Sequence, residues 1–300
     1  MMKNPKLLIG TIFMIALFFF GIFGPYLPFV DKDLSMEGSR VIDGEIKLPP
    51  FPPSIENLFG TDRKGIDLLS RIILGTREVL IVLFSVVLLR YLVAIPLGVF
   101  SLYSRGVKWV QDFLNKFLSF VPPIFMVILI VNMPILVYSE HRYYIVIGII
   151  ALLEAGRAAE KIHLQVQSIS QKPYIEAAIT TGSGPVALFK RYYVPALIPE
   201  LIVSVFLELG RTMFLIGQLG IVKIYLSHKL QVIEAQTSIV VEVQNTSNAW
   251  PLLFSDILQD IFVYPWIPFV ACAIITIVIL GFFTLADGLR KHFQKGYEYL

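Results

Sequence analysis

The chain has 300 residues, of which 56% are hydrophobic and only 16% are charged, and its mean hydropathy is +0.74. Soluble domains carry about 25% charged residues, so this composition excludes an ordinary soluble protein and indicates an integral membrane protein. The net charge of +3 is small and scattered, so nucleic acid is not an expected partner. The single cysteine, Cys272, excludes an intrachain disulfide, and the four histidines lie far apart, so no metal site or other cofactor is expected.

A membrane-spanning helix needs roughly 20 mostly apolar residues, and the first candidate is Leu7–Phe29. This segment is uncharged and too long for the core of a signal peptide, so residues 1–30 are expected to form a retained anchor. An extracytoplasmic loop over residues 31–78 follows. Its Pro49–Pro53 stretch predicts a stiff bend, and the apolar spacing within Ile66–Thr76 predicts a helix along the membrane interface.

Residues 79–289 are expected to form a five-helix core, followed by a tail over residues 290–300. The fourth candidate span of the chain, which begins at Tyr143, is short, and it crosses the membrane only if the helix continues past Glu154. In chain order the five candidates are Val79–Leu102, Phe117–Ser139, a segment that begins at Tyr143, Leu201–Val222 and Ile261–Ala286. The predicted fold class is therefore all-α, a polytopic membrane protein with about six transmembrane helices.

The distribution of Lys and Arg predicts the orientation, because these residues concentrate on the cytoplasmic side of short loops. With the N-terminus inside, the inner segments carry 13 of them and the outer segments 10, seven of which lie in the one long loop. We therefore expect both termini to be cytoplasmic. The chain is expected to be a multi-pass protein of the cytoplasmic (inner) membrane, surrounded by lipid.

The most informative segment is the polar stretch over residues 173–195, here named the helical hairpin, between the fourth and fifth candidate spans. Pro173 suits the first turn of a helix, and Gly182 suits the position just past its end. Pro185 can open a second helix, and Pro195 is expected to stop it. The segment predicts a compact helix–turn–helix at the membrane surface, which is a suitable shape for docking a partner.

The residue types in this hairpin resemble those of a known family. Glu176 falls early in its helix, where the helix dipole favours a negative charge, and the small Ala177 and Ala178 allow close approach to another surface. Glu176-Ala177-Ala178, followed by Gly182 and Pro195, resembles the EAA motif of bacterial ABC-importer permeases. In that family the motif forms cytoplasmic coupling helices that sit in a groove of an ATPase subunit.

Two further blocks resemble the oligopeptide, dipeptide and nickel branch of the same permeases. One begins with Leu58-Phe59-Gly60-Thr61-Asp62 before the second span, and the other is Asp287-Gly288-Leu289-Arg290 after the last span. The resemblance implies a type I ABC-importer permease fold. It also implies a second permease subunit, two ABC ATPase subunits and an extracytoplasmic substrate-binding protein as partners.

Charged residues within candidate spans are costly, about 2.5–3.5 kcal/mol each on insertion scales, so they are usually buried or functional. Arg90, Glu208 and Arg211 are such residues, and Glu154 and Arg157 lie near the inner end of the fourth span. Each acid has a base three residues away, on the same helix face. Two interpretations remain open: a polar lining of the translocation path, or ion pairs that hold helices together.

The resemblance implies a permease that moves peptides or similar small solutes. The chain contains no phosphate-binding Gly-x4-Gly-Lys-Ser/Thr run, so it is not expected to be an enzyme, and no catalytic residue is assigned. One alternative is a permease for nickel or a metal–chelator complex. Another is a membrane scaffold or signalling subunit that has the same fold but does not transport.

Overall fold

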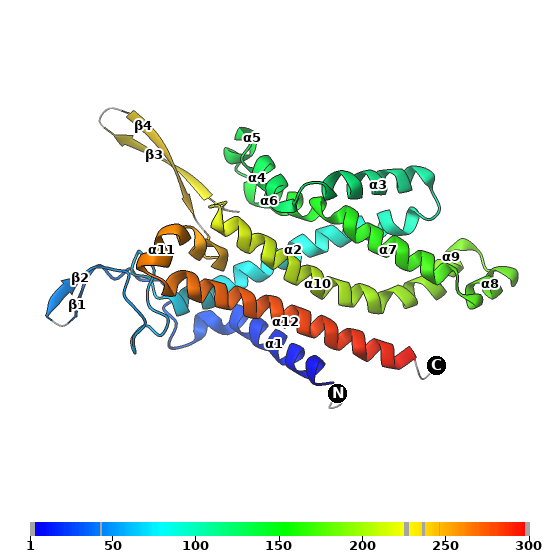
Figure 1. The fold of residues 1–300 in the computed structure, drawn as a ribbon, viewed down its shortest axis with the longest axis horizontal. Coiled ribbons are helices and arrows are strands. Elements are labelled where there is room, and N and C mark those ends of the chain that lie inside the picture. The colour runs from blue at the N-terminus through cyan, green and yellow to red at the C-terminus, as the bar shows by residue number, and fades with distance from the viewer. Residues whose placement is uncertain (1–3, 43, 225–227, 236–237, 246, 298–300) are drawn as a thin grey trace.

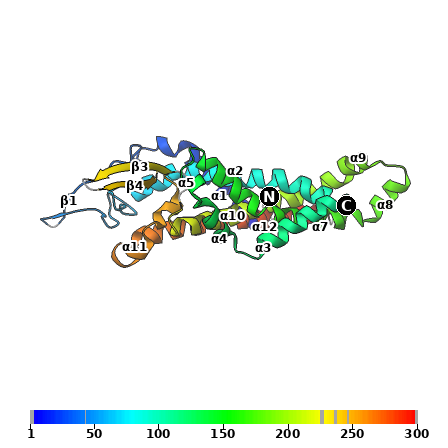
Figure 2. The same ribbon diagram turned by 90° about the horizontal axis from the view of Figure 1, so that it is seen from above.

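The computed structural model describes residues 4–42, 44–224, 228–235, 238–245 and 247–297, which form an elongated helix bundle (Figures 1 and 2). Two-stranded β-ribbons project beyond one end, here named the loop end, and α8 and α9 lie at the other, the hairpin end. The elements in chain order are α1 (Pro5–Phe23), η1 (Gly24–Tyr26), β1 (Arg40–Ile42), β2 (Glu45–Lys47), α2 (Leu68–Phe100), α3 (Arg105–Ser119), α4 (Pro123–Val131), α5 (Pro134–Val137), α6 (Arg142–Leu153), α7 (Ala155–Ser170), α8 (Pro173–Thr180), α9 (Pro185–Leu188), η2 (Phe189–Tyr193), α10 (Val194–Ile221), β3 (His228–Ala235), β4 (Ser238–Asn245), η3 (Trp250–Phe254), α11 (Ile257–Val263) and α12 (Trp266–Tyr297).

Four helical runs among the described residues are long and apolar enough to cross a membrane. They are Pro5–Tyr26, Leu68–Phe100, Val186–Ile221 and Trp266–Gln294. α12 packs along both α1 and α10, while α2 packs along α7. The predicted class, an all-α polytopic membrane protein, is confirmed.

The third and fourth predicted spans differ from the prediction, because neither is a single long helix. The region predicted as Phe117–Ser139 is divided among the end of α3, α4 and α5, and α4 and α5 begin at Pro123 and Pro134. Proline lacks an amide hydrogen and its ring clashes with the preceding turn, so it ends the helix before it. α3 and α4 run one way along the bundle, and α6 and α7 run back, joined at Glu154 (Figure 1). Neither pair contains a single helix that is long and apolar enough to cross a membrane, so four of the six predicted spans are present as such among the described residues.

The loop end contains strands that the sequence analysis does not predict. β1 pairs antiparallel with β2, and β3 pairs antiparallel with β4 from His228 opposite Asn245 to Ala235 opposite Ser238. The helix expected over Ile66–Thr76 forms, but it is the first part of α2. The domain boundary expected after residue 78 therefore falls inside a continuous helix.

The block that begins at Leu58 builds the turn before α2. The side-chain Oδ1 of Asp62 accepts hydrogen bonds from the amides of Lys64 at 2.8 Å and Ile66 at 3.0 Å. Asp67 then caps α2, since its Oδ2 accepts from the Ser70 amide at 2.8 Å. Asp62 thus holds the turn, and Asp67 satisfies an amide that the helix start would leave unpaired, which explains where α2 begins.

The block Asp287–Arg290 ties α12 to the start of α1. Asn4 Nδ2 donates to the Gly288 carbonyl at 2.7 Å, and Lys6 Nζ lies 2.9 Å from Asp287 Oδ2. A Cβ on Gly288 would lie 2.5 Å from the Leu7 backbone, so glycine is needed for this close approach. The start of α1 and the end of α12 both lie toward the hairpin end (Figure 1).

Candidate functional site

The first helix of the helical hairpin ends at a glycine turn. The Ser183 amide donates to the Ala178 carbonyl at 3.0 Å and the Gly182 amide to the Ile179 carbonyl at 2.9 Å, which is the Schellman pattern. Gly182 has a φ of +86°, and among the described residues nothing lies within 4 Å of the position of its Cβ. The backbone conformation, and not crowding, therefore favours glycine. The predicted helix and the break at Gly182 are confirmed.

The two faces of α8 differ in exposure. Ile175 and Ala178 are 1% and 4% exposed and belong to the hydrophobic core of the chain. Glu176 and Ala177 are exposed, together with Ile179 at 56%. Ala177 is therefore available to another protein, whereas Ala178 packs within its own chain. The exposed face combines a carboxylate with apolar surface.

The second half of the helical hairpin differs from the prediction that Pro195 stops a helix. α9 passes through a π-helical turn, Phe189–Tyr193, directly into α10, and Pro195 lies in the first turn of α10. Proline is tolerated there because it follows the π-helical turn, in which the Val194 amide bonds to the Phe189 carbonyl five residues back and the wider turn accommodates the ring. The helical run from Val186 to Ile221 is thus continuous.

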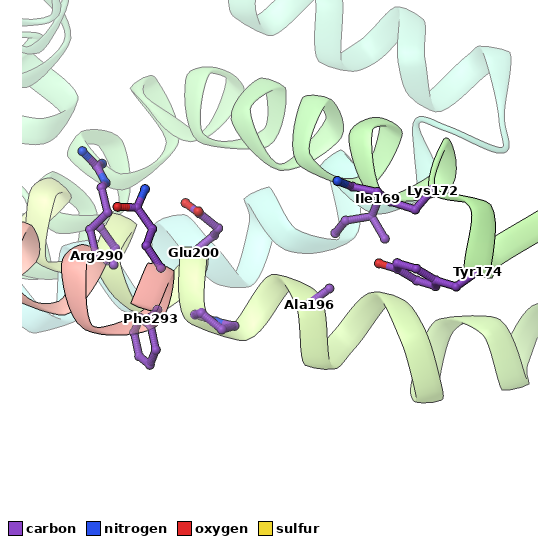
Figure 3. A pocket seen from close by; sticks show the side chains of 10 residues that line it. Ile169, Lys172, Tyr174, Ala196, Glu200, Arg290 and Phe293 are labelled. Carbon is purple, nitrogen blue, oxygen red and sulfur yellow. The ribbon is translucent and has the colours of Figure 1, made fainter. Parts of the chain in front are cut away.

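A hollow of about 220 Å³ lies at the base of the hairpin. It is lined by Lys172 and Tyr174 on one side, Glu200 of α10, and Arg290 and Phe293 of α12 (Figure 3). The start of α8 is therefore separated from α12 by open space. The hairpin is held instead through α7 and through the helical run into α10.

A second candidate site is a buried ion cluster in the middle of the bundle. The Nη1 atom of Arg90 lies 2.7 Å from Glu208 Oε2 and 3.2 Å from Glu154 Oε2. Its Nη2 donates to the Ile150 carbonyl at 3.2 Å. Arg90 is 0% exposed, so its charge is compensated by two carboxylates, as a buried cation requires.

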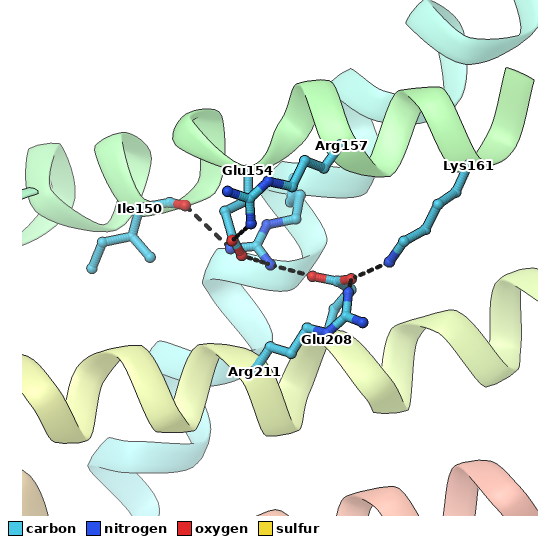
Figure 4. Close-up of polar contacts among 7 residues, drawn as sticks. Ile150, Glu154, Arg157, Lys161, Glu208 and Arg211 are labelled. Carbon is cyan, nitrogen blue, oxygen red and sulfur yellow. Dashed lines mark hydrogen bonds and ion pairs between the residues drawn. The ribbon is translucent and has the colours of Figure 1, made fainter. Parts of the chain in front are cut away.

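Glu208 and Glu154 extend this cluster to three further cations (Figure 4). Glu208 Oε1 lies 2.9 Å from Lys161 Nζ and 2.8 Å from Arg211 Nη1. Glu154 Oε1 lies 3.1 Å from Arg157 Nη1. The ion cluster thus consists of six side chains, and it joins α2, α7 and α10 with the residue between α6 and α7: Arg90, Glu154, Arg157, Lys161, Glu208 and Arg211.

The two acid–base pairs predicted from the sequence are present, but they belong to one cluster that also contains Lys161, which the sequence does not predict. A signal for Lys161 exists, because it lies four residues after Arg157 on the same face of α7. Its bond to Glu208 of α10 depends on how the helices pack and has no local signal. Among the described residues, no group of three or more His, Cys, Asp or Glu could hold a metal ion.

Part of the ion cluster lines an open groove between α7, α10, α12 and the start of α4. Glu154, Arg157 and Arg211 face this groove together with the rings of Phe214 and Phe283. The side chains of Arg157 and Arg211 are 43% and 50% exposed, whereas that of Glu154 is 12% exposed. The cluster therefore has a buried part that holds helices together and a cationic part that reaches open space.

Comparison with known proteins identifies relatives over nearly the whole chain, although no protein-family model matches it. The peptide transport system permease protein SapC of Haemophilus influenzae is 26% identical, covering 99% of this chain and 92% of the relative. The oligopeptide transport system permease protein OppC of Bacillus subtilis and the dipeptide transport system permease protein DppC of Alkalihalophilus pseudofirmus are each 25% identical, covering 96% of this chain and 85% of the relative. The resemblance to ABC-importer permeases, predicted from the motifs, is confirmed.

Proposed function

We propose that the chain is the transmembrane permease subunit of an ATP-driven importer that moves peptides or similar small solutes across the cytoplasmic membrane. The observation that carries this proposal is the helical hairpin. It presents Glu176 and Ala177 on an exposed face and continues directly into the spanning run Val186–Ile221. The names of the relatives favour peptides over nickel or a metal–chelator complex.

The proposed partners follow from the two ends of the molecule. Two ATPase subunits dock on the helical hairpins of this chain and of a second permease, and the two permeases enclose one pathway between them. A substrate-binding protein delivers the solute at the loop end. The chain has no phosphate-binding loop motif, so ATP hydrolysis is assigned to the ATPases.

The proposed orientation places the hairpin end in the cytoplasm. The start of α1, the end of α12 and the helical hairpin lie toward the same end of the bundle, which supports a common side for all three (Figure 1). The excess of Lys and Arg in the segments assigned to that side supports the cytoplasm as its location.

The ion cluster is proposed to border the translocation path. Arg90 and Glu208, at 0% and 4% exposure, hold the helices of the path in place. Arg211 has a second role, because it pairs with Glu208 and also lines the open groove. Both interpretations that the sequence left open therefore apply, to different members of one cluster.

The test is a charge reversal on the exposed face of α8 in the assembled importer. Glu176→Lys should lower the amount of ATPase that co-purifies with the permease, and it should lower ATP-dependent peptide uptake, at normal abundance in the membrane. The matched control is Glu140→Lys, since Glu140 is also exposed but follows α5, away from the helical hairpin.

Two results would contradict the proposal. Normal ATPase binding and uptake by Glu176→Lys would remove the docking role of the helical hairpin. An assembled wild-type complex that hydrolyses ATP but moves no peptide would instead favour the scaffold or signalling interpretation.

A further inference from the structure

The ion cluster carries more positive charge than its own carboxylates neutralise. Within the described part of the chain, its cations are Arg90, Arg157, Lys161 and Arg211 and its anions are Glu154 and Glu208, so two positive charges are in excess. Arg90 lies ten residues before the end of α2, about 15 Å from it along the helix. At that depth a charge is costly unless it is paired, as that of Arg90 is, and the excess positive charge of the cluster attracts an anion that enters from outside the chain.

The excess charge is located where another molecule can reach it. Arg90 is fully buried, but Arg157 and Arg211 are 43% and 50% exposed and line the groove. Each of these two guanidinium groups has a single ion pair within the described part of the chain, made through its Nη1. A guanidinium has five N–H donors, so both keep donors that can point into the groove.

The rest of the groove lining fits an amphipathic ligand. The rings of Phe214 and Phe283 and the side chain of Leu215 supply apolar surface beside the two arginines, and Gln218 supplies an amide. Planar guanidinium groups match carboxylates, which they bind through two parallel hydrogen bonds. Apolar surface with two cationic forks suits a small ligand that carries both a carboxylate and uncharged side chains.

We propose that Arg157 and Arg211 form a carboxylate-binding site in the groove, which binds acidic groups of the peptide cargo and selects acidic peptides over basic ones. This inference rests on the proposed function, since it takes peptide transport as given and adds the chemistry of selection. The same two excess cations repel a basic peptide side chain. The site therefore attracts acidic peptides and disfavours basic ones.

The experiment uses the complete importer in proteoliposomes with its substrate-binding protein. Two tripeptides, Ala-Glu-Ala and Ala-Lys-Ala, are bound to saturation to the binding protein, and their uptake rates are measured and compared as a ratio. Loading is measured separately, so that the ratio reports the permease and not the binding protein. The wild type should take up the Glu peptide faster than the Lys peptide.

The variants are Arg157→Gln, Arg211→Gln and the double variant, which remove the charge but keep a polar, though shorter, side chain. The double variant should lower the ratio of the two rates about tenfold, which corresponds to about 1.4 kcal/mol of discrimination. Arg211→Lys retains the charge and should restore most of the ratio.

The matched control is Lys108→Gln. Lys108 also joins helices, through ion pairs with Asp112 at 3.0 Å and Glu160 of α7 at 3.3 Å, but it does not line the groove. This control should leave the ratio at the wild-type value, even where it lowers stability.

Several outcomes would overturn the inference. If the wild type takes up Ala-Glu-Ala no faster than Ala-Lys-Ala, the inference is wrong, even if the Gln variants fail to assemble. An unchanged ratio in the assembled double variant, or an equal change in Lys108→Gln, also does so. A ratio that depends on anionic lipid in the vesicles would assign the groove to a lipid phosphate instead. Absence of uptake of either peptide by the wild type would refute the proposed function itself, which is a distinguishable result.

Discussion

The loop end and the helical hairpin are joined to the bundle in opposite ways. At the loop end, helices and loops touch backbone to backbone: a Cβ on Gly220 would lie 2.0 Å from the Pro251 carbonyl oxygen, and one on Gly75 would lie 2.3 Å from that of Asn248. At the hairpin end, a Cβ on Gly182 would meet nothing within 4 Å among the described residues. Close packing therefore requires glycine at Gly220 and Gly75, whereas backbone conformation requires it at Gly182.

The difference in packing suits the loop end to a fixed position and the helical hairpin to movement. The loop end also buries Trp250, whose Nε1 donates to the Ile72 carbonyl at 2.7 Å, so α2 and η3 are fixed to one another. The helical hairpin contributes few buried side chains, such as Ile175 and Ala178, and has a hollow at its base. A segment with few internal contacts can change position when a partner binds it, at little cost to the rest of the fold.

The largest expected effect tests the rigidity of the loop end. Trp250→Ala removes a fully buried indole and its hydrogen bond, and should lower the free energy of unfolding by about 3–5 kcal/mol. Thermal stability of the purified protein measures this. Trp250→Phe keeps most of the ring volume and should cost much less. A Trp250→Ala protein as stable as the wild type would contradict the contrast between the ends.

A matched pair of glycine substitutions compares the two ends directly. Gly220→Ala places a methyl group against the Pro251 backbone, which cannot move as a flexible side chain would, and should cost about 1–3 kcal/mol of global stability. Gly182→Ala has space for its methyl group and bears only the strain of a positive φ, about 1 kcal/mol and confined to the hairpin. Equal melting temperatures for the two variants would remove the distinction.

A bulkier change at the hairpin separates stability from function. Gly182→Val adds a β-branched side chain at a φ of +86°, so the turn should change direction and move Glu176 out of its docking position. Membrane abundance should stay near normal while ATP-dependent uptake falls or the ATPases detach. Abundance, co-purified ATPase and uptake are measured together, with Gly182→Ala as the milder comparison. Normal uptake by Gly182→Val would contradict the coupling role.

The smallest effect is expected where an ion pair lies on the surface. Lys6 and Asp287 are 47% and 45% exposed, so Lys6→Gln should change the free energy of unfolding by less than about 1 kcal/mol. The nearby hydrogen bond from Asn4 to Gly288 keeps α1 against α12 in this variant. A marked loss of stability, measured in the same thermal assay, would show that the ends of the chain depend on this pair.

Local chemistry was sufficient to predict the features that depend on neighbouring residues. The positive φ of Gly182 and the start of α8 at Pro173 both follow from rules for helix ends, and both are present. The strands β3 and β4 also have a local signal that could have been used, since residues 228–245 are rich in Val and Ile. Long apolar runs predicted four of the spanning helices for the same reason.

Features that depend on packing between distant segments could not be predicted. Arg90 and Glu208 are 118 residues apart, and nothing in either neighbourhood shows that they meet. The local rule that proline ends a helix predicts a stop at Pro195, because it considers only the residues around the proline. The π-helical turn before it, Phe189–Tyr193, arises where the helical hairpin joins a long packed helix, and it lets the helix continue.

The unbroken run from Val186 to Ile221 has a mechanical consequence. As an ideal helix its 36 residues span about 54 Å, from the second half of the helical hairpin to Gly220, which lies against Pro251. A rod of this length converts a small tilt into a large swing: about 10° moves the far tip by roughly 9 Å. In the proposed importer, leverage of this kind would let a partner bound at the helical hairpin open or shut a gate on the opposite side of the membrane, with no signal passed from residue to residue.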